Sequence, residues 1–199
     1  LDASAHSLAA LDAAVTLAAS LHAEVTGLFV EDTAILRMAE LPCTREVGAF
    51  SGVAREFTRR DIERQLRAQA ALAERALAAS AGRARVTWSF RVSRGSVSSE
   101  LVAASDEVDL VTVGSHASRI AGWRHVGSTA RAVLAGTRCP VLLMRHGARL
   151  VPPVMVVFDG TPGANDALDV AGQFARAMDH DLVVMTADDG SGDVERLAQ

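Results

Sequence analysis

The stretch that decides the fold is residues 109–129, DLVTVGSHASRIAGWRHVGST. It opens with an apolar run, 109–113, which is typical of a buried strand, and it closes with Gly127-Ser128-Thr129 ahead of an apolar helical pattern. In an open parallel sheet, ligands bind outside the carboxyl ends of the strands. The connection between this strand and this helix is therefore the first place to look for a binding site.

Strand-like and helix-like segments alternate on both sides of this stretch. Apolar residues at helical spacing predict helices over 4–22, 55–81, 95–105 and 128–136, and short apolar or alternating runs predict strands over 25–30, 86–92, 109–113 and 141–144. Residues 33–54 show no period and are predicted to be an irregular connection. The alternation predicts an α/β fold, an open parallel sheet with helices on both faces.

The longest predicted helix has two faces of different chemistry. Its apolar face consists of Ile62, Leu66, Ala70, Ala73 and Leu77. Its opposite face carries Arg60, Arg64, Arg67 and Arg75. The first face is expected to lie in the core and the second in solvent.

Composition excludes several chemistries. All 20 basic residues among the 199 are Arg, so the chain has no Lys, and it has no Tyr. A P-loop and a pyridoxal Schiff base both need a lysine amine and are therefore excluded. If the chain holds phosphate, then backbone N–H groups, hydroxyls or Arg must do so.

The net charge, the cysteines and the histidines exclude further classes of protein. The net charge of −4 provides no general basic field for nucleic acid or an anionic membrane. Cys43 and Cys139 form no disulfide framework, and the six histidines lack metal-ligand spacing, so no metal site is expected. No apolar run is long enough to span a bilayer, and the default expectation is a reducing cytoplasm.

The end of the chain repeats its beginning. A shift of 157 residues places Asp2 on Asp159, 10–12 on 167–169, Asp32 on Asp189, and strand 25–30 on 182–187. This pattern predicts a tandem duplication. An apolar run, 154–158, precedes Asp159, whereas only Leu1 precedes Asp2, so the first strand of the first copy is expected to be missing. The predicted domains are 1–146 and 153–199, joined by a linker over 147–152.

Three segments together carry a family resemblance. DLVTVGSH at 109–116, Gly-Ser at 127–128 and RCPVLLM at 138–144 resemble the end of a universal stress protein domain. The stretches 2–11 and 158–162 resemble its beginning, so the chain is similar to a tandem member of that family. The resemblance implies a five-stranded parallel sheet in the order 3-2-1-4-5, of the adenine nucleotide alpha hydrolase-like type. The missing strand would be the central one, so the chain alone is expected to be poorly stable unless another strand, such as 154–158, fills its place.

Members of that family that bind ATP carry the motif G-x-x-G-x9-G-[ST]. Here Gly114, Gly127 and Ser128 match it at the family's spacing, but Ala117 replaces the second glycine. If that position needs a positive φ, alanine costs about 1–2 kcal/mol. If it needs only close approach, one methyl group intrudes on a phosphate.

The resemblance also implies individual contacts with an adenine nucleotide. It assigns Asp2 to the ribose and the backbone of Val30 to the adenine. It places nucleotide-lining backbone at Val113, Gly114 and Ala117, and phosphate contacts at Gly127, Ser128 and Thr129. Arg119 and Arg124 lie in the loop and offer the only cations there. Structural alternatives stay open: Asp2 as an anion at a helix N-terminus, Gly127 as a turn, Ser128 as a helix cap, and both arginines as solvated side chains.

The remaining chemically active residues form no catalytic set. His116 is either a base or a solvated loop side chain, and Ser128 has no nucleophile elbow or orienting acid. Asp106, Glu107 and Asp109 precede a strand, at the edge away from the expected site. Cys139 before Pro140 is expected to be a small buried residue at a strand entry.

Three functions follow from the sequence. The first is a stress-response regulatory protein that binds ATP or a related adenine nucleotide without evident turnover. The second is a nucleotide-free dimerisation or partner-binding module with a degenerate site at Ala117, pairing through the strand 141–144. The third is an enzyme acting on adenine nucleotides in a related fold.

Overall fold

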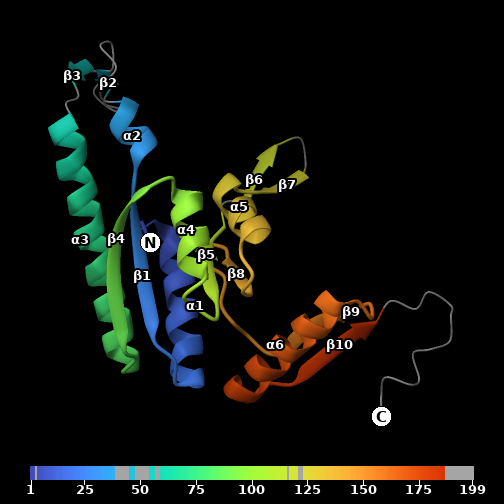
Figure 1. Cartoon of the computed structure of the whole chain (residues 1–199). Helices are drawn as coiled ribbons and strands as arrows, with labels where there is room; N and C mark the ends of the chain where they lie inside the picture. The colour runs from blue at the N-terminus through green and yellow to red at the C-terminus, as the bar shows by residue number, and fades with distance from the viewer. Residues whose placement is uncertain are drawn as a thin grey trace. The chain divides into compact units, whose positions relative to one another are not determined.

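The computed structural model describes residues 1–186, apart from 3, 39–44, 48–53, 57–58, 116 and 121–122 (Figure 1). In the short strands 45–47, 54–56, 117–120 and 123–126 it describes the backbone only. The chain divides into two compact units, with the boundary between Ala148 and Arg149. Each unit is described by itself.

Unit 1 alternates strands and helices, as the sequence predicts. Its helices are α1 (Ala5–Leu21), α2 (Thr33–Met38), α3 (Arg59–Ala84), α4 (Val97–Ser105) and α5 (Ser128–Gly136). Its strands are β1 (Val25–Asp32), β2 (Arg45–Val47), β3 (Ala54–Glu56), β4 (Trp88–Gly95), β5 (Val111–Gly114), β6 (Ala117–Ile120), β7 (Trp123–Val126) and β8 (Val141–Met144). The α/β fold is confirmed.

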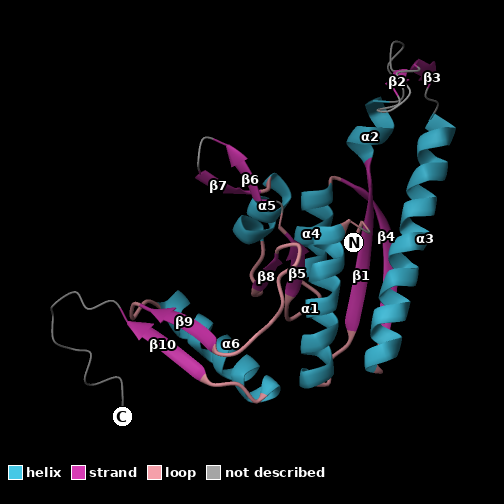
Figure 2. Cartoon of the chain, turned by 180° about the vertical axis from the view of Figure 1, so that it is seen from behind, coloured by secondary structure: helices cyan, strands magenta, loops and turns pink. Residues whose placement is uncertain are grey.

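The parallel strands of unit 1 form two pairs (Figure 2). β1 pairs with β4 in register from Val25 opposite Trp88, and β5 pairs with β8 from Val111 opposite Val141. These are two of the four adjacencies in the order 3-2-1-4-5. Within the described residues no strand joins β1 to β5. The other two adjacencies require a strand ahead of Asp2 and stay a prediction.

Two apolar clusters hold α1 and α3 against the strands. Leu77 of α3 is fully buried with Leu11 and Val15 of α1, and Phe29 of β1 is buried among the apolar residues of α3. The predicted apolar face of α3 is buried along its whole length. α1 also packs on β5 and β8, while α4 and α5 contact each other. The core of unit 1 therefore positions the start of α1 beside the end of β5.

Several boundaries differ from the sequence prediction. Gly95 ends β4 and does not begin a helix, since α4 starts at Val97. The segment 33–54 is not wholly irregular, because α2 occupies 33–38 and the antiparallel pair β2–β3 follows. α3 begins at Arg59 and not at residue 55, since β3 takes 54–56. The loop after β5 contains an antiparallel hairpin, β6–β7. Strands of three or four residues are too short to show a clear period, which is why the sequence pattern did not reveal them.

Unit 2 contains β9 (Val154–Phe158), α6 (Pro162–Met178) and β10 (Leu182–Thr186), with β9 and β10 parallel. The bounds of α6 are those of α1 shifted by 157 residues. Each helix begins with a hydroxyl cap, Ser4 or Thr161, and ends at a left-handed residue, His22 (φ 54°) or Asp179 (φ 52°). The matched position Asp189 lies outside the described residues. The elements correspond as the duplication predicts, and the duplication itself stays a prediction.

Candidate functional site

The carboxyl end of β5 lies against the first turn of α1. A Cβ atom at Gly114 would lie 2.7 Å from the backbone carbon and oxygen of His6 and 2.9 Å from the nitrogen of Ser7. Real Cβ atoms do not approach backbone so closely, so this contact requires glycine. Gly114 therefore fits the predicted role of close backbone approach, here toward α1.

Asp2 lies just ahead of α1 in a tight polar turn. Its Oδ1 accepts a hydrogen bond from the backbone N–H of Ser4 at 3.0 Å, and its own N–H donates to Oγ of Ser7 at 3.1 Å. Burial opposes the charged carboxylate, but the hydrogen bonds from Ser4 and Ser7 and the nearby amino terminus outweigh it, so the pKa of Asp2 is lowered. Asp2 is therefore an anion held at the start of α1.

Asp159 repeats this turn in unit 2. Its Oδ1 accepts from the backbone N–H of Thr161 at 3.0 Å and from the Thr161 hydroxyl at 2.7 Å. The Thr161 hydrogen bonds lower the pKa of Asp159. The turn is repeated in both units, which fits a structural role at a helix start as well as the ribose contact that the resemblance assigns to Asp2, and that contact stays a prediction.

A histidine pair lies at the same edge of unit 1. The backbone N–H of His146, just after β8, donates to Nδ1 of His6 at 3.3 Å, and the two ring centroids are 5.9 Å apart. Beside it Ser115 is buried, and its N–H donates to the carbonyl of Met144 at 2.7 Å. Sequence reasoning missed this pair because 140 residues separate its members and no local motif marks it.

The N-terminus of α5 has no side-chain cap. Gly127 is its N-cap residue, with φ −55° and ψ 155°, and as a glycine it offers no side-chain acceptor to the first turn. Ser128 and Thr129 are the first two helical residues. An uncapped helix start leaves backbone N–H groups and the positive end of the helix dipole for an anion. Ser128 is therefore not the helix cap, and the assignment of Gly127–Thr129 to phosphate stays a prediction.

The hairpin β6–β7 links β5 to α5 and carries three predicted residues. Ala117 is the first residue of β6, opposite Val126. A β-strand residue has an extended backbone, which any L-residue adopts, so the positive-φ objection to alanine does not apply to this conformation. Arg119 and Arg124 occupy directly opposite positions in the hairpin. His116 lies outside the described residues.

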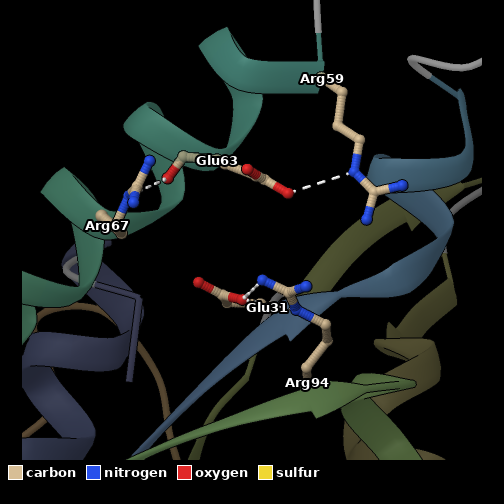
Figure 3. A network of polar contacts seen from close by, with 5 residues as sticks. All are labelled: Glu31, Arg59, Glu63, Arg67 and Arg94. Carbon is tan, nitrogen blue, oxygen red and sulfur yellow. Dashed lines mark hydrogen bonds and ion pairs between the residues drawn. The ribbon is translucent and has the colours of Figure 1, made fainter.

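The end of β1 carries a charged pair next to Val30 (Figure 3). Glu31 is 9% exposed, and its Oε2 lies 2.6 Å from Nη2 and 2.8 Å from Nε of Arg94 on β4. The two residues are register partners, so the ion pair ties the ends of β1 and β4 together. Neither residue was singled out from the sequence, because their pairing depends on strand register across 63 residues.

The predicted residues therefore fall into two groups. Asp2, Val113 and Gly114 lie around the first turn of α1 and the end of β5, and the hairpin from Ala117 leads on to Gly127–Thr129 at α5. Val30 belongs to the second group, because β1 is not hydrogen-bonded to β5. We use the name carboxyl edge for the first group together with the neighbouring Ser115, which was not predicted: Asp2, Val113, Gly114, Ser115, Ala117 and Gly127–Thr129.

In the part of the chain that the structure describes, no cluster of side chains indicates a metal site. There, no three His, Cys, Asp or Glu side chains gather at metal-binding distance. Cys139 is a free, half-buried thiol. Among the described helices, none is both long and apolar enough to cross a membrane. The carboxyl edge thus offers backbone N–H groups, hydroxyls and a helix dipole, which together suit an anionic ligand.

These features define an α/β protein with parallel strands and a candidate anion site at their carboxyl ends. The model of the universal stress protein family matches residues 1–145. The chain therefore belongs to the universal stress protein family. No match was found among curated proteins.

Two solved structures resemble this chain. A universal stress protein from Archaeoglobus fulgidus DSM 4304 has a TM-score of 0.72 and 17% identity, over 99% of this chain and 68% of that one. Universal stress protein UspA from Lactobacillus plantarum has a TM-score of 0.51 and 21% identity, over 73% of this chain and 93% of that one. At these identities the likeness shows the fold.

Proposed function

We propose that this protein binds ATP or a related adenine nucleotide at the carboxyl edge and acts as a stress-response regulator through binding, without turnover. The observation that carries the proposal is the start of α5, where a glycine N-cap leaves the helix without a side-chain cap. Hydroxyl side chains cap α1 and α6, whereas α4 shares with α5 the lack of a side-chain cap. Phosphate would take the place of the missing cap.

The surrounding residues support the same assignment. Ser128 and Thr129 add hydroxyl donors to the backbone N–H groups of the helix start. Arg119 and Arg124 occupy opposite register positions in the hairpin backbone that leads to α5, and both are cationic residue types. Phosphate binding of this kind needs no lysine, which agrees with a chain whose basic residues are all arginine. The adenine nucleotide is inferred from the family motif, and the preference for an anionic ligand is inferred from the geometry at the start of α5.

A charge placed at the helix start tests the proposal. Ser128→Asp puts a carboxylate in the first turn of α5, where the dipole stabilises the helix but the charge repels phosphate. We expect ATP binding, measured by isothermal titration calorimetry on the whole protein, to weaken by at least about tenfold. Thermal stability should not fall, so unfolding would not explain the loss.

The matched control is Ser98→Asp, which places the same charge in the first turn of α4, another helix without a side-chain cap. ATP affinity should be unchanged in this variant. Absence of binding heat from the unaltered protein at millimolar ATP would refute the proposal. Equal losses in both variants would show that the effect is not local to α5.

The nucleotide-free module remains the second candidate, and one observation favours it. β8 pairs with β5 on one side, and no described strand pairs with its other edge, which leaves that edge available for a second copy. Ala117→Gly separates the two candidates. Gain of ATP binding by this variant, where the unaltered protein has none, would favour the degenerate site.

A further inference from the structure

The outer face of α3 carries arginines that neither the core nor the carboxyl edge uses. Arg60, Arg64, Arg67 and Arg75 are all exposed. At 3.6 residues per turn they fall within an arc of about 80° around the helix axis, and the helical rise spreads them over about 22 Å. These four residues are named the arginine stripe.

The arginine stripe is positively charged, although the protein as a whole is acidic. α3 holds six arginines and three carboxylates, a net charge of +3, whereas the whole chain carries −4, so the rest of the chain carries −7. Glu74 borders the stripe, and Asp61 lies on its other side. The positive charge is therefore concentrated on one helix face and is not a general property of the chain.

The guanidinium groups of the stripe are largely unused by the protein. Arg67 Nε donates to the carbonyl of Glu63 at 3.1 Å, against its own helix (Figure 3), and Arg75 Nε donates to the carbonyl of Ala71 at 3.0 Å. Arg64 lies 3.3 Å from Asp61, an exposed pair of the kind worth about 0–1 kcal/mol. Arg60, Arg67 and Arg75 form no ion pair with any other described residue.

Small residues lie between and beside the arginines. The inner side of α3 packs on β1, β4 and α1, which lie on that side of the helix in both overall views (Figures 1 and 2). Ala68, Ala71 and Ala78 lie between or beside the arginines. Small side chains let a second helix approach to an interaxial distance of about 8–10 Å.

We propose that the arginine stripe docks an acidic helix of a partner protein, whose carboxylates pair with the arginines. Charge complementarity selects this occupant, because carboxylates three or four residues apart on one helix face match the spacing of Arg60, Arg64 and Arg67, and Arg75 lies on the same face eight residues further on. A membrane fits less well, since no large apolar side chain lies between the arginines. Nucleic acid fits less well, since the stripe has no aromatic side chain and the chain is acidic.

Two labelled peptides of one composition test this docking. The first carries glutamates on one face of an alanine-based helix, and the second carries the same number scattered around the helix. Fluorescence anisotropy with the whole chain should show the one-face peptide binding at least about fivefold more tightly than the scattered one, and more weakly as salt rises.

A matched pair of variants locates the binding surface. Arg67→Gln removes one charge from the stripe, while Arg83→Gln removes one exposed charge from the same helix about 80° outside it. Affinity for the one-face peptide should fall about fivefold in the first variant and less than about twofold in the second. Circular dichroism should show both variants folded.

Three outcomes would overturn the proposal. The first is no binding of the one-face peptide at either low or physiological salt. The second is equal binding of both peptides, or equal loss in both variants, since a docked helix demands a specific face. The third is stripe-dependent binding of a DNA duplex, or of vesicles containing phosphatidylserine, with none of the peptide, which would assign the stripe to another class of partner.

Discussion

At the scale of single residues, Gly114 links the family motif to the packing of unit 1. The motif places glycine there for approach to a nucleotide, but the structure shows that α1 already requires it, because the His6 and Ser7 backbone occupies the space of a Cβ atom. Gly114 is therefore required for the packing of α1 and, in the proposed function, also for the close approach of the nucleotide. Its replacement should therefore cost stability even without ligand.

Gly114→Ala should lower the free energy of unfolding by about 1–3 kcal/mol, the usual range for overpacking. Urea denaturation of the whole chain measures this. The control is Gly82→Ala in α3, where nothing lies within 4 Å of the added methyl group. That variant should gain about 0.5–1 kcal/mol, because alanine is the better helix former. A Gly114→Ala protein as stable as the original would contradict the close contact.

At the scale of elements, α3 separates two roles on one helix. Its inner face is buried from Ile62 to Ala81 and joins α1 to β1, while its outer face carries the arginine stripe. Burial depends on the inner face alone, so the outer face is free to vary without loss of the fold. Two leucines of this helix test that division.

Leu77 is fully buried, whereas Leu72 on the same helix is 52% exposed. Leu77→Ala should cost about 2–5 kcal/mol of unfolding free energy, because it leaves a cavity between α1, α3 and Gly27. Leu72→Ala should change it by less than about 0.5 kcal/mol. Chemical denaturation compares the two, and similar costs would mean that the inner face does not hold the core.

At the scale of the whole molecule, the two units bury different amounts around similar elements. α1 buries six residues, including Leu11, Val15 and Leu17, while α6, of equal length and similar caps, buries three alanines. β10 is exposed at every position, and β9 exposes Met155 and Val157. A single two-stranded sheet with one helix gains little stability from burial.

Hydrogen exchange should therefore be faster in unit 2. We expect amides of α6 to exchange at least about tenfold faster than those of α1, since local opening costs less where fewer apolar contacts break. Mass spectrometry of peptides from the two helices makes the comparison directly, because their lengths and caps are matched. Equal protection in α1 and α6 would show that another part of the protein covers unit 2.

Part of the candidate site could be predicted because it depends on local sequence. Gly127 and Ser128 lie at a helix start, as the apolar pattern after them indicates, and Gly114 ends a strand that an apolar run predicts. The hairpin β6–β7 could not be predicted, because neither 117–120 nor 123–126 alternates apolar and polar residues.

The sequence by itself determined the alternation of elements, the bounds of α5 and β8, the buried face of α3 and the lysine-free chemistry, because each rests on neighbouring residues or on composition. Only the tertiary structure decided that His6 meets His146, that Glu31 pairs with Arg94, and that α1 leaves no room for a side chain at Gly114. Those contacts join residues 63 or more positions apart. Packing and strand register bring them together, and no local pattern encodes either.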